Sequence, residues 1–303
     1  MSQAEAFRSG FVTLIGRPNV GKSSLVNRLV GEHVAIVSSK AQTTRRRILG
    51  VLHGPGLQIV WVDTPGVHQP RTGLGRWMMA EARQAVEGVE AVCLVLDAAS
   101  TDPGPGDAWS AGLARSAGVP VLVLLNRADL VPEAERADRL GAYRELCDGW
   151  QARFTSAVSG EGLESLVADI GALLPPGPRY FPPEAHTNQP EELLAAELVR
   201  EQALRELRDE VPHALAVTVD AWQRRPNGVL YVAATLTLER ESQKGIVIGR
   251  GGAMLRAIGE PARLEISRRL ATPVYLDLRV KVKEGWRDRP GSLQTLGFDG
   301  KGR

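Results

Sequence analysis

The chain has few cysteines, too few for stabilisation by several disulfides or by a cysteine-bound zinc ion. Cys93 and Cys147 are the only cysteines among 303 residues. Two cysteines cannot form a disulfide framework, and neither has a second cysteine or a histidine at the spacing of a zinc site. We therefore expect a reducing compartment and no structural zinc. We interpret Cys93, inside AVCLVL, as a small core residue of a buried strand.

The chain also lacks long apolar runs. The two longest stretches, residues 91–96 and 119–125, are far shorter than the roughly 18 residues that cross a bilayer. The first ten residues, MSQAEAFRSG, include an early glutamate and no apolar core, so they do not resemble a secretory signal. These observations argue against an integral membrane protein and predict a cytoplasmic one.

Length and composition are typical of a folded protein with more than one domain. Because a domain takes roughly 150 residues, 303 residues suggest about two. Hydrophobic residues make up 43% and charged residues 24% of the chain, an ordinary globular balance. This balance excludes a fully disordered or collagen-like chain.

The net charge of +2 hides an uneven distribution. Residues 1–178 carry 17 basic and 18 acidic side chains, residues 184–239 carry 5 and 10, and residues 240–303 carry 14 and 7. A basic C-terminal segment is typical of a protein that binds a phosphate backbone, although arginine-rich solvated helix faces give a similar count.

The first half alternates short apolar runs with helical patterns, which predicts parallel β-α-β units in a doubly wound α/β domain. The predicted strands are residues 11–16, 48–53, 57–63, 91–97, 119–126 and 152–155. The predicted helices are residues 22–30, 74–87, 107–117, 134–146 and 163–173. PPGPRYFPP, residues 175–183, ends this domain because its proline and glycine content excludes regular structure.

Beyond this segment the predicted order becomes α-β-β-α-α-β, an α+β domain. It starts with a long amphipathic helix at residues 190–209 and ends with a strand at residues 274–282. The strands between them are predicted at residues 213–222 and 229–238, joined by the turn RRPNG. We place the first domain at residues 8–176, a linker at 177–187 and the second domain at 188–303.

A phosphate-binding loop follows the first strand. GRPNVGKS, residues 16–23, matches G-x-x-x-x-G-K-[ST] between a strand and a helix. Its N–H groups and the helix N-terminus favour phosphate oxygens, Lys22 supplies a charge to the β- and γ-phosphates, and the Ser23 hydroxyl can ligate Mg²⁺. The predicted nucleotide contacts are Gly16, Arg17, Pro18, Asn19, Val20, Gly21, Lys22 and Ser23.

DTPG, residues 63–66, follows a strong strand. Its Asp63 carboxylate can hold the Mg²⁺ shell, and the Gly66 N–H can approach the γ-phosphate. Thr64 and Pro65 complete this set of predicted nucleotide contacts.

The polar stretch VSSKAQTTRRRI contains two candidates, Thr43 and Thr44, for a threonine that caps Mg²⁺ only when GTP is bound, and we favour Thr44. The predicted metal ligands are thus Ser23, Thr44 and Asp63. The predicted catalytic residues are Lys22, Thr44 and Gly66. The arginine triplet at residues 45–47 fits a solvated face or an RNA-contacting segment.

A base-recognition element, NRAD, occupies residues 126–129. The Asp129 carboxylate can accept both N1–H and N2–H₂ of guanine, a donor pair that adenine lacks, so the motif predicts GTP over ATP. Asn126 opens the motif, and Arg127 stands where the usual form, N-K-x-D, has lysine. The stem of Arg127 can still pack on the base, while the contact of its head group with the phosphate loop is left open. Ser156 and Ala157 of TSA are predicted to complete the site, with the Ala157 N–H directed at guanine O6.

The second domain carries a glycine-rich loop between two helical patterns. Glycines there allow a nucleotide backbone to approach closely, although a lone G-x-x-G also fits a tight turn between helices. Alternate basic residues on the last strand, Arg279, Lys281 and Lys283, are predicted to share one face. The predicted RNA contacts are Gly249, Arg250, Gly251, Gly252, Lys281 and Lys283.

In their order along the chain, GRPNVGKS, AQTTR, DTPG and NRAD, followed by VIGRGG and the ending VYLDLRVKVKEGWRDRPGSLQTLGF, resemble the Era GTPases over nearly the whole length. The resemblance implies a Ras-like G domain and a type II KH domain. It also implies GTP or GDP with Mg²⁺ as ligands, GTP hydrolysis, and a role in assembling the 30S ribosomal subunit by binding 16S rRNA near its 3′ end. A monomer with peripheral association to the cytoplasmic membrane is implied as well. The departures from the family pattern are Arg127 and the loop G-R-G-G.

Two points stay open in the phosphate-binding half. Val67 follows DTPG where Ras has the glutamine that orients the attacking water, so slow intrinsic hydrolysis is expected. Asn19 resembles the residue that helps hold K⁺ in related GTPases, and a role only in stabilising the loop is an equal alternative.

A P-loop kinase or ATPase shares GRPNVGKS but has no need of NRAD. A regulatory GTPase with a protein-interaction C-terminal domain remains the main competing reading.

Overall fold

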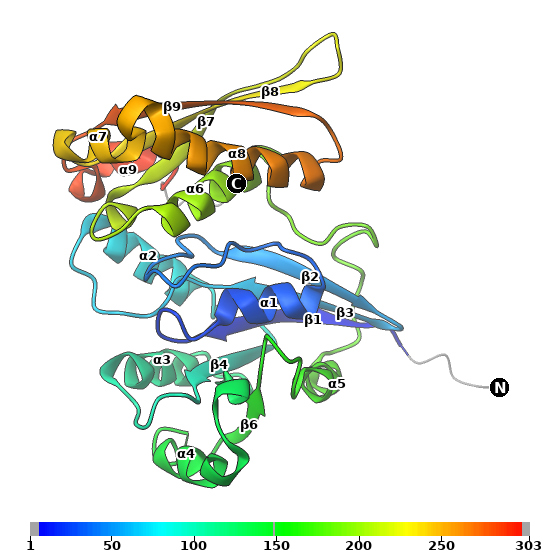
Figure 1. The fold of residues 1–303 in the computed structure, drawn as a ribbon. Coiled ribbons are helices and arrows are strands. Elements are labelled where there is room, and N and C mark those ends of the chain that lie inside the picture. The colour runs from blue at the N-terminus through cyan, green and yellow to red at the C-terminus, as the bar shows by residue number, and fades with distance from the viewer. Residues whose placement is uncertain (1–5, 148, 299–303) are drawn as a thin grey trace. The chain divides into compact units, whose positions relative to one another are not determined.

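The computed structural model describes residues 6–147 and 149–298 (Figure 1). They belong to two compact units. The first consists of Met1–Val37, Thr44–Gln69 and Met78–Asn188, and the second of Ser38–Thr43, Pro70–Trp77 and Gln189–Arg303. Two short segments of the first half therefore group with the second unit, which contiguous domain boundaries do not anticipate.

The first unit is built on a six-stranded sheet in the order β2-β3-β1-β4-β5-β6. The strands are β1 (Arg8–Ile15), β2 (Ile48–Gly54), β3 (Leu57–Asp63), β4 (Ala91–Asp97), β5 (Val121–Asn126) and β6 (Gln151–Thr155). All neighbours are parallel except β2 and β3, which are antiparallel. The prediction of parallel units is thus wrong for β2. Only Pro55 and Gly56 separate it from β3, whereas a parallel pair needs a crossover of a dozen or more residues.

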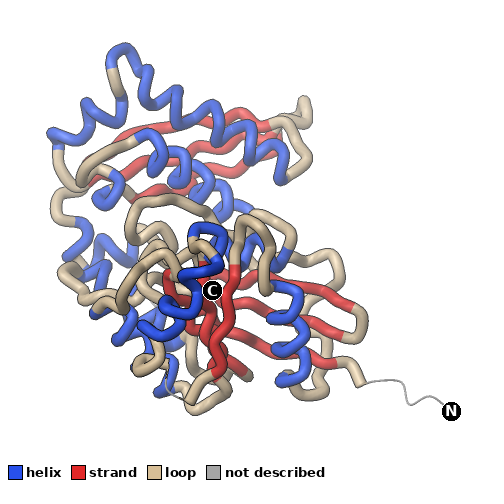
Figure 2. The backbone as a smooth tube through the Cα atoms, turned by 60° about the horizontal axis from the view of Figure 1, so that its bottom comes forward, coloured by secondary structure: helices blue, strands red, loops and turns tan. Residues whose placement is uncertain are grey.

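Helices cover both faces of this sheet, as Figure 2 shows with helices in blue and strands in red. They are α1 (Lys22–Val30), α2 (Gly73–Gln84), α3 (Pro105–Ser116), α4 (Arg136–Ala142) and α5 (Leu163–Leu173). Successive strand residues face opposite cores: Leu14 packs in one cluster with α1 and α5, and Ile15 in the other with α3. The α/β fold class is confirmed, and the carboxyl ends of the parallel strands gather at one edge.

The predicted linker lies along the first unit's sheet. The Gln58 amide oxygen on β3 accepts hydrogen bonds from the backbone N–H groups of Tyr180 (2.8 Å) and Phe181 (3.1 Å). The Val51 N–H of β2 donates to the His186 carbonyl oxygen at 2.9 Å. The segment is irregular, as its prolines predict, but it is held by specific bonds.

The second unit carries a three-stranded sheet in the order β7-β8-β9, antiparallel between β7 and β8 and parallel between β8 and β9. Its elements are α6 (Glu191–Glu206), β7 (Ala216–Arg224), β8 (Leu230–Leu238), α7 (Glu241–Ile248), α8 (Ala253–Arg269), β9 (Val274–Val282) and α9 (Pro290–Thr295). Leu198, Val232 and Ile258 belong to one core cluster between the helices and the sheet. The predicted order α-β-β-α-α-β is present, and α9 follows it without having been predicted.

No helix among the residues that the structure describes is long and apolar enough to cross a membrane.

Candidate nucleotide-binding site

The phosphate-binding loop joins β1 to α1 and curls around the Lys22 side chain. The Lys22 ammonium donates to the carbonyl oxygens of Gly16 (2.9 Å) and Arg17 (3.1 Å) and is buried. Burial lowers the pKa of Lys22 to about 8; the nearby Asp63 carboxylate opposes this shift, and the Arg17 guanidinium adds to it. An anion placed in the loop would favour the charged form of Lys22.

Ser23, Thr44 and Asp63 converge beside Lys22. The Ser23 hydroxyl donates to Asp63 Oδ2 at 2.6 Å, the Thr44 hydroxyl donates to the same oxygen at 3.1 Å, and the two hydroxyls are 2.7 Å apart. Burial raises the pKa of Asp63, an effect that the Lys22 charge and the two hydroxyls oppose. Asp63 Oδ1 is buried, and no side chain of the described residues donates a hydrogen bond to it.

This donor set fits Mg²⁺. A small hard cation takes oxygen ligands and keeps several waters, so one carboxylate with two hydroxyls is a suitable protein contribution. The Thr43 hydroxyl does not bond to these residues but donates to the Lys40 carbonyl oxygen at 2.7 Å. Of the two candidate threonines, the structure brings Thr44 to the other predicted metal ligands.

The DTPG segment lies directly against the phosphate-binding loop. A Cβ atom on Gly66 would be 2.6 Å from the Cα atom of Pro18, so only glycine allows this approach. The Val67 N–H donates to the Gly16 carbonyl oxygen at 3.0 Å. These two contacts hold the DTPG segment against the phosphate-binding loop.

The residues predicted to recognise the base lie at and just after the ends of β5 and β6. The Asn126 amide donates to the Val20 carbonyl oxygen at 2.7 Å, which ties NRAD to the phosphate-binding loop. The Ser156 hydroxyl donates to Asp129 Oδ1 at 2.5 Å and accepts from the N–H groups of Val158 and Ser159. This bond from Ser156 orients the Asp129 carboxylate. Because Asp129 is exposed, the carboxylate is also open to a ligand.

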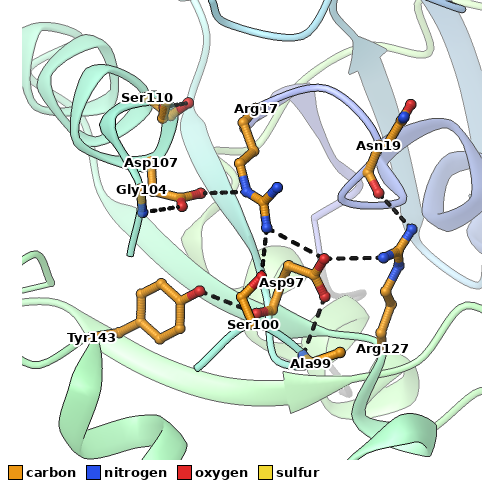
Figure 3. A network of polar contacts seen from close by, with 12 residues as sticks. Arg17, Asn19, Asp97, Ala99, Ser100, Gly104, Asp107, Ser110, Arg127 and Tyr143 are labelled. Atoms are coloured by element: carbon orange, nitrogen blue, oxygen red, sulfur yellow. Dashed lines mark hydrogen bonds and ion pairs between the residues drawn. The ribbon is translucent and has the colours of Figure 1, made fainter. Parts of the chain in front are cut away.

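Arg127 makes the contact that the sequence left open. Its Nη2 donates to the Asn19 carbonyl oxygen at 2.6 Å, and its Nη1 forms an ion pair with Asp97 Oδ2 at 3.0 Å (Figure 3). Asp97 ends β4, next to the base-recognition strand β5.

Arg17 approaches Asp97 from the other side in Figure 3. Its guanidinium lies 3.4 Å from Asp97 Oδ2, donates to the Ser100 hydroxyl at 2.7 Å and pairs with Asp107 at 3.3 Å. Sequence reasoning missed Asp97. Its position at the carboxyl end of a buried parallel strand, where ligand sites of such sheets form, was the available signal.

The arginine triplet is not one solvated face. Arg45 is buried, and Arg47 pairs with Glu81 at 3.2 Å.

The glycine-rich loop of the second unit lies between α7 and α8. Gly249, Gly251 and Gly252 have φ values of 71°, 57° and 80°, the left-handed region that favours glycine. Arg250 is exposed at the tip, and the Arg256 guanidinium donates to the Gly251 carbonyl oxygen at 3.0 Å. On β9, Arg279 and Lys281 are exposed and alternate with the core residues Leu278 and Val280; Lys283 follows the strand.

The fold and these residues define a P-loop GTPase with a C-terminal KH domain. The family model of 50S ribosome-binding GTPases matches residues 11–127, and the KH domain model matches residues 210–287.

Relatives that match this chain over nearly their whole length identify the family within this class. The chain is 44% identical to the GTPase Era of Heliobacterium modesticaldum over 98% of this chain and 99% of the relative, and 45% identical to that of Mycobacterium tuberculosis over 96% and 99%. The crystal structure of an Aquifex aeolicus Era variant bound to GDP·AlF₄⁻ matches with a TM-score of 0.92 and 35% identity over 96% of this chain and 99% of that one. A crystal structure of Era in complex with MgGDPNP and nucleotides 1506–1542 of 16S ribosomal RNA matches with the same values. The chain belongs to the Era family of GTPases.

Proposed function

We propose that this GTPase binds GTP and GDP with Mg²⁺ and uses its KH domain to bind 16S rRNA near the 3′ end during assembly of the 30S subunit. The convergence of Ser23, Thr44 and Asp63 beside the buried Lys22 supports the nucleotide half most directly. The Era relative in complex with MgGDPNP and a 16S rRNA segment supports both halves. The proposal includes a monomer in the cytoplasm that associates peripherally with the membrane, and domain boundaries at 8–176, 177–187 and 188–303.

The chain's own residues have distinct roles in this proposal. Lys22 and the loop N–H groups of residues 16–23 neutralise the β- and γ-phosphates. Ser23, Thr44 and Asp63 hold Mg²⁺, which neutralises charge on the phosphates when it is bound. The Gly66 N–H contacts the γ-phosphate. Asp129, oriented by Ser156, selects guanine.

Hydrolysis is expected to be slow without a further component. Val67 is buried and apolar, so it cannot orient the attacking water as a glutamine does. A K⁺ ion held by the Asn19 side chain would place a positive charge against the phosphates, where other GTPases use an arginine finger. A role of Asn19 only in stabilising the loop is the alternative. Faster turnover in K⁺ than in Na⁺ buffer, abolished in Asn19→Ala, supports the first; equal turnover in the two buffers contradicts it.

Two variants test the two halves of the function separately. Lys22→Ala should lose most GTP affinity in calorimetry and retain RNA binding. Arg250→Asp places a negative charge at the tip of the glycine-rich loop, where it repels phosphates, and should weaken binding to the 1506–1542 segment of 16S rRNA without changing GTP affinity. Arg250 has no left-handed φ that its replacement would strain. Wild-type RNA affinity in the folded Arg250→Asp variant would favour the competing reading, a regulatory GTPase with a protein-interaction domain.

A further inference from the structure

The KH sheet has a polar and aromatic face that the proposed RNA loop does not use. Even-numbered residues of β8 and β9, such as Val232, Leu236 and Leu278, pack toward the helices. Figure 1 shows α6 and α8 on this side of the three strands. Because side chains alternate along a strand, Tyr231 and Tyr275 lie on the opposite face, whereas the glycine-rich loop belongs to the helical layer.

Tyr231 and Tyr275 form a cross-strand aromatic pair capped by an arginine. They are register partners between β8 and β9, with ring centroids 5.9 Å apart and planes inclined by 22°. The Arg225 guanidinium, from the turn between β7 and β8, lies 4.7 Å from the Tyr231 ring centroid and 5.0 Å from that of Tyr275. The two rings and the guanidinium therefore form one compact aromatic and cationic cluster, which we call the tyrosine platform.

Polar bonds hold the platform in one orientation. The Tyr231 hydroxyl donates to Asp277 Oδ2 at 3.0 Å, and the Arg279 guanidinium donates to the same oxygen at 3.0 Å. Asp277 therefore fixes the ring of Tyr231 and places Arg279 next to the platform. Since rigid aromatic groups lose little conformational entropy on binding, this arrangement is suited to a flat ligand.

The platform is open to solvent and carries more basic than acidic groups, with Arg225, Arg279 and Lys281 on the same face as Asp220 and Asp277. Tyr275 has 54% of its surface exposed, the kind of exposure that a pair serving only sheet stability does not need. Arg225 is exposed and contacts the two tyrosine rings, and Lys281 lies further along the same face of β9. An exposed aromatic pair with an excess of cationic over acidic groups around it matches a single-stranded nucleic acid, whose bases are flat and whose backbone is anionic.

We propose that the tyrosine platform is a second RNA contact of the KH domain, which stacks an unpaired base while Arg225 and Arg279 approach the neighbouring phosphates. The proposal rests on the RNA-binding function proposed above. A G-x-x-G loop clamps about four nucleotides, so a longer single strand has nucleotides left for a separate surface.

Binding of the full-length protein to the 1506–1542 segment of 16S rRNA, followed over a range of salt concentrations, tests this contact. Tyr275→Ala should weaken binding about tenfold with an unchanged salt slope, because stacking is not electrostatic. Tyr275→Phe keeps the ring and should bind as the wild type does. Arg225→Gln should lower the slope of log K against log salt by about 0.7, the value for one lost phosphate contact on a single strand.

Matched controls separate this contact from the function on which it rests. Leu264→Ala removes an exposed apolar side chain of α8 that is 56% exposed, and it should leave RNA affinity unchanged. Ultraviolet crosslinking of the wild-type complex should yield a nucleotide adduct on a peptide containing Tyr231 or Tyr275, a readout that needs no variant to fold.

If folded Tyr275→Ala binds RNA with wild-type affinity and no such adduct forms, the tyrosine platform is not an RNA contact. Loss of RNA binding in Arg250→Asp would still support the proposed function in that case. Wild-type RNA affinity combined with loss of 30S co-sedimentation in Tyr275→Ala assigns the surface to a protein partner and also overturns the platform as an RNA contact. No RNA binding by the wild-type protein overturns both proposals.

Discussion

Arg127 donates a hydrogen bond from Nη2 to the Asn19 carbonyl oxygen, 2.6 Å away, and so joins the NRAD segment to the phosphate-binding loop. Both residues have left-handed backbone angles, with φ of 67° for Arg127 and 65° for Asn19. Such angles are costly outside glycine and persist where the surroundings hold them. The planar guanidinium also reaches Asp97 with its second nitrogen, a fork that a lysine ammonium does not offer.

Asp97 should contribute to nucleotide affinity without touching the nucleotide. Its carboxylate accepts from Arg127 and Arg17, so Asp97→Asn removes the charge that holds both arginines. A charged hydrogen bond contributes about 1.5–3 kcal/mol, which predicts GDP binding weaker by about 10- to 150-fold in calorimetry. Asp102→Asn, an exposed carboxylate in the loop after β4, is the matched control. Equal affinity of Asp97→Asn and the wild type would show that the bridge is not needed.

Asp129→Asn should change base preference from guanine toward xanthine. The asparagine side-chain oxygen can still accept from the Ser156 hydroxyl, while its amide donates to the xanthine O2 in place of accepting from the guanine amino group. Competition between GTP and XTP for the purified variant measures the change, with thermal unfolding as the control for folding. A retained preference for GTP contradicts the assignment of Asp129.

Lys281 and Lys283 should act on RNA through charge alone. Replacing both with glutamine is expected to weaken binding to RNAs of any sequence and to reduce the salt slope by about 1.4, since each phosphate contact on a single strand contributes about 0.7. Electrophoretic shifts across salt concentrations measure the slope. Arg83→Gln, an exposed charge on α2, should leave it unchanged. An unaltered slope in the double variant removes these lysines from the RNA contact.

The two cysteines should be unreactive while the protein is folded. Burial raises the pKa of Cys93 to about 12 and that of Cys147 to about 11, and the reactive thiolate is correspondingly scarce near neutral pH. The folded state therefore holds these protons as pH rises above the ordinary value of about 8.5, so this contribution to stability is lost at alkaline pH. At about pH 8, we expect a thiol reagent to modify both cysteines slowly in the native protein and rapidly in denaturant. Rapid native modification would contradict the burial.

Sequence patterns located the elements whose signals are local. α1 and α5 occupy the predicted residues 22–30 and 163–173, because apolar periodicity and glycines just before each helix mark their bounds. β1 begins at Arg8, three residues before the predicted start. Its first residues pair with β3 through backbone hydrogen bonds, which the side-chain pattern does not predict. The helix predicted at 134–146 is shorter, with α4 covering Arg136–Ala142.

The fold class and the motifs of the nucleotide site could be predicted from residue order, because a P-loop, DTPG and NRAD each encode their chemistry within a few residues. Packing of distant segments shows which threonine joins Ser23 and Asp63, and that Asp97 bridges Arg17 and Arg127. It also shows that Tyr231 and Tyr275 stack across two strands. These contacts join residues that the chain brings together only when distant segments pack, and residue spacing within one segment carries no record of such packing.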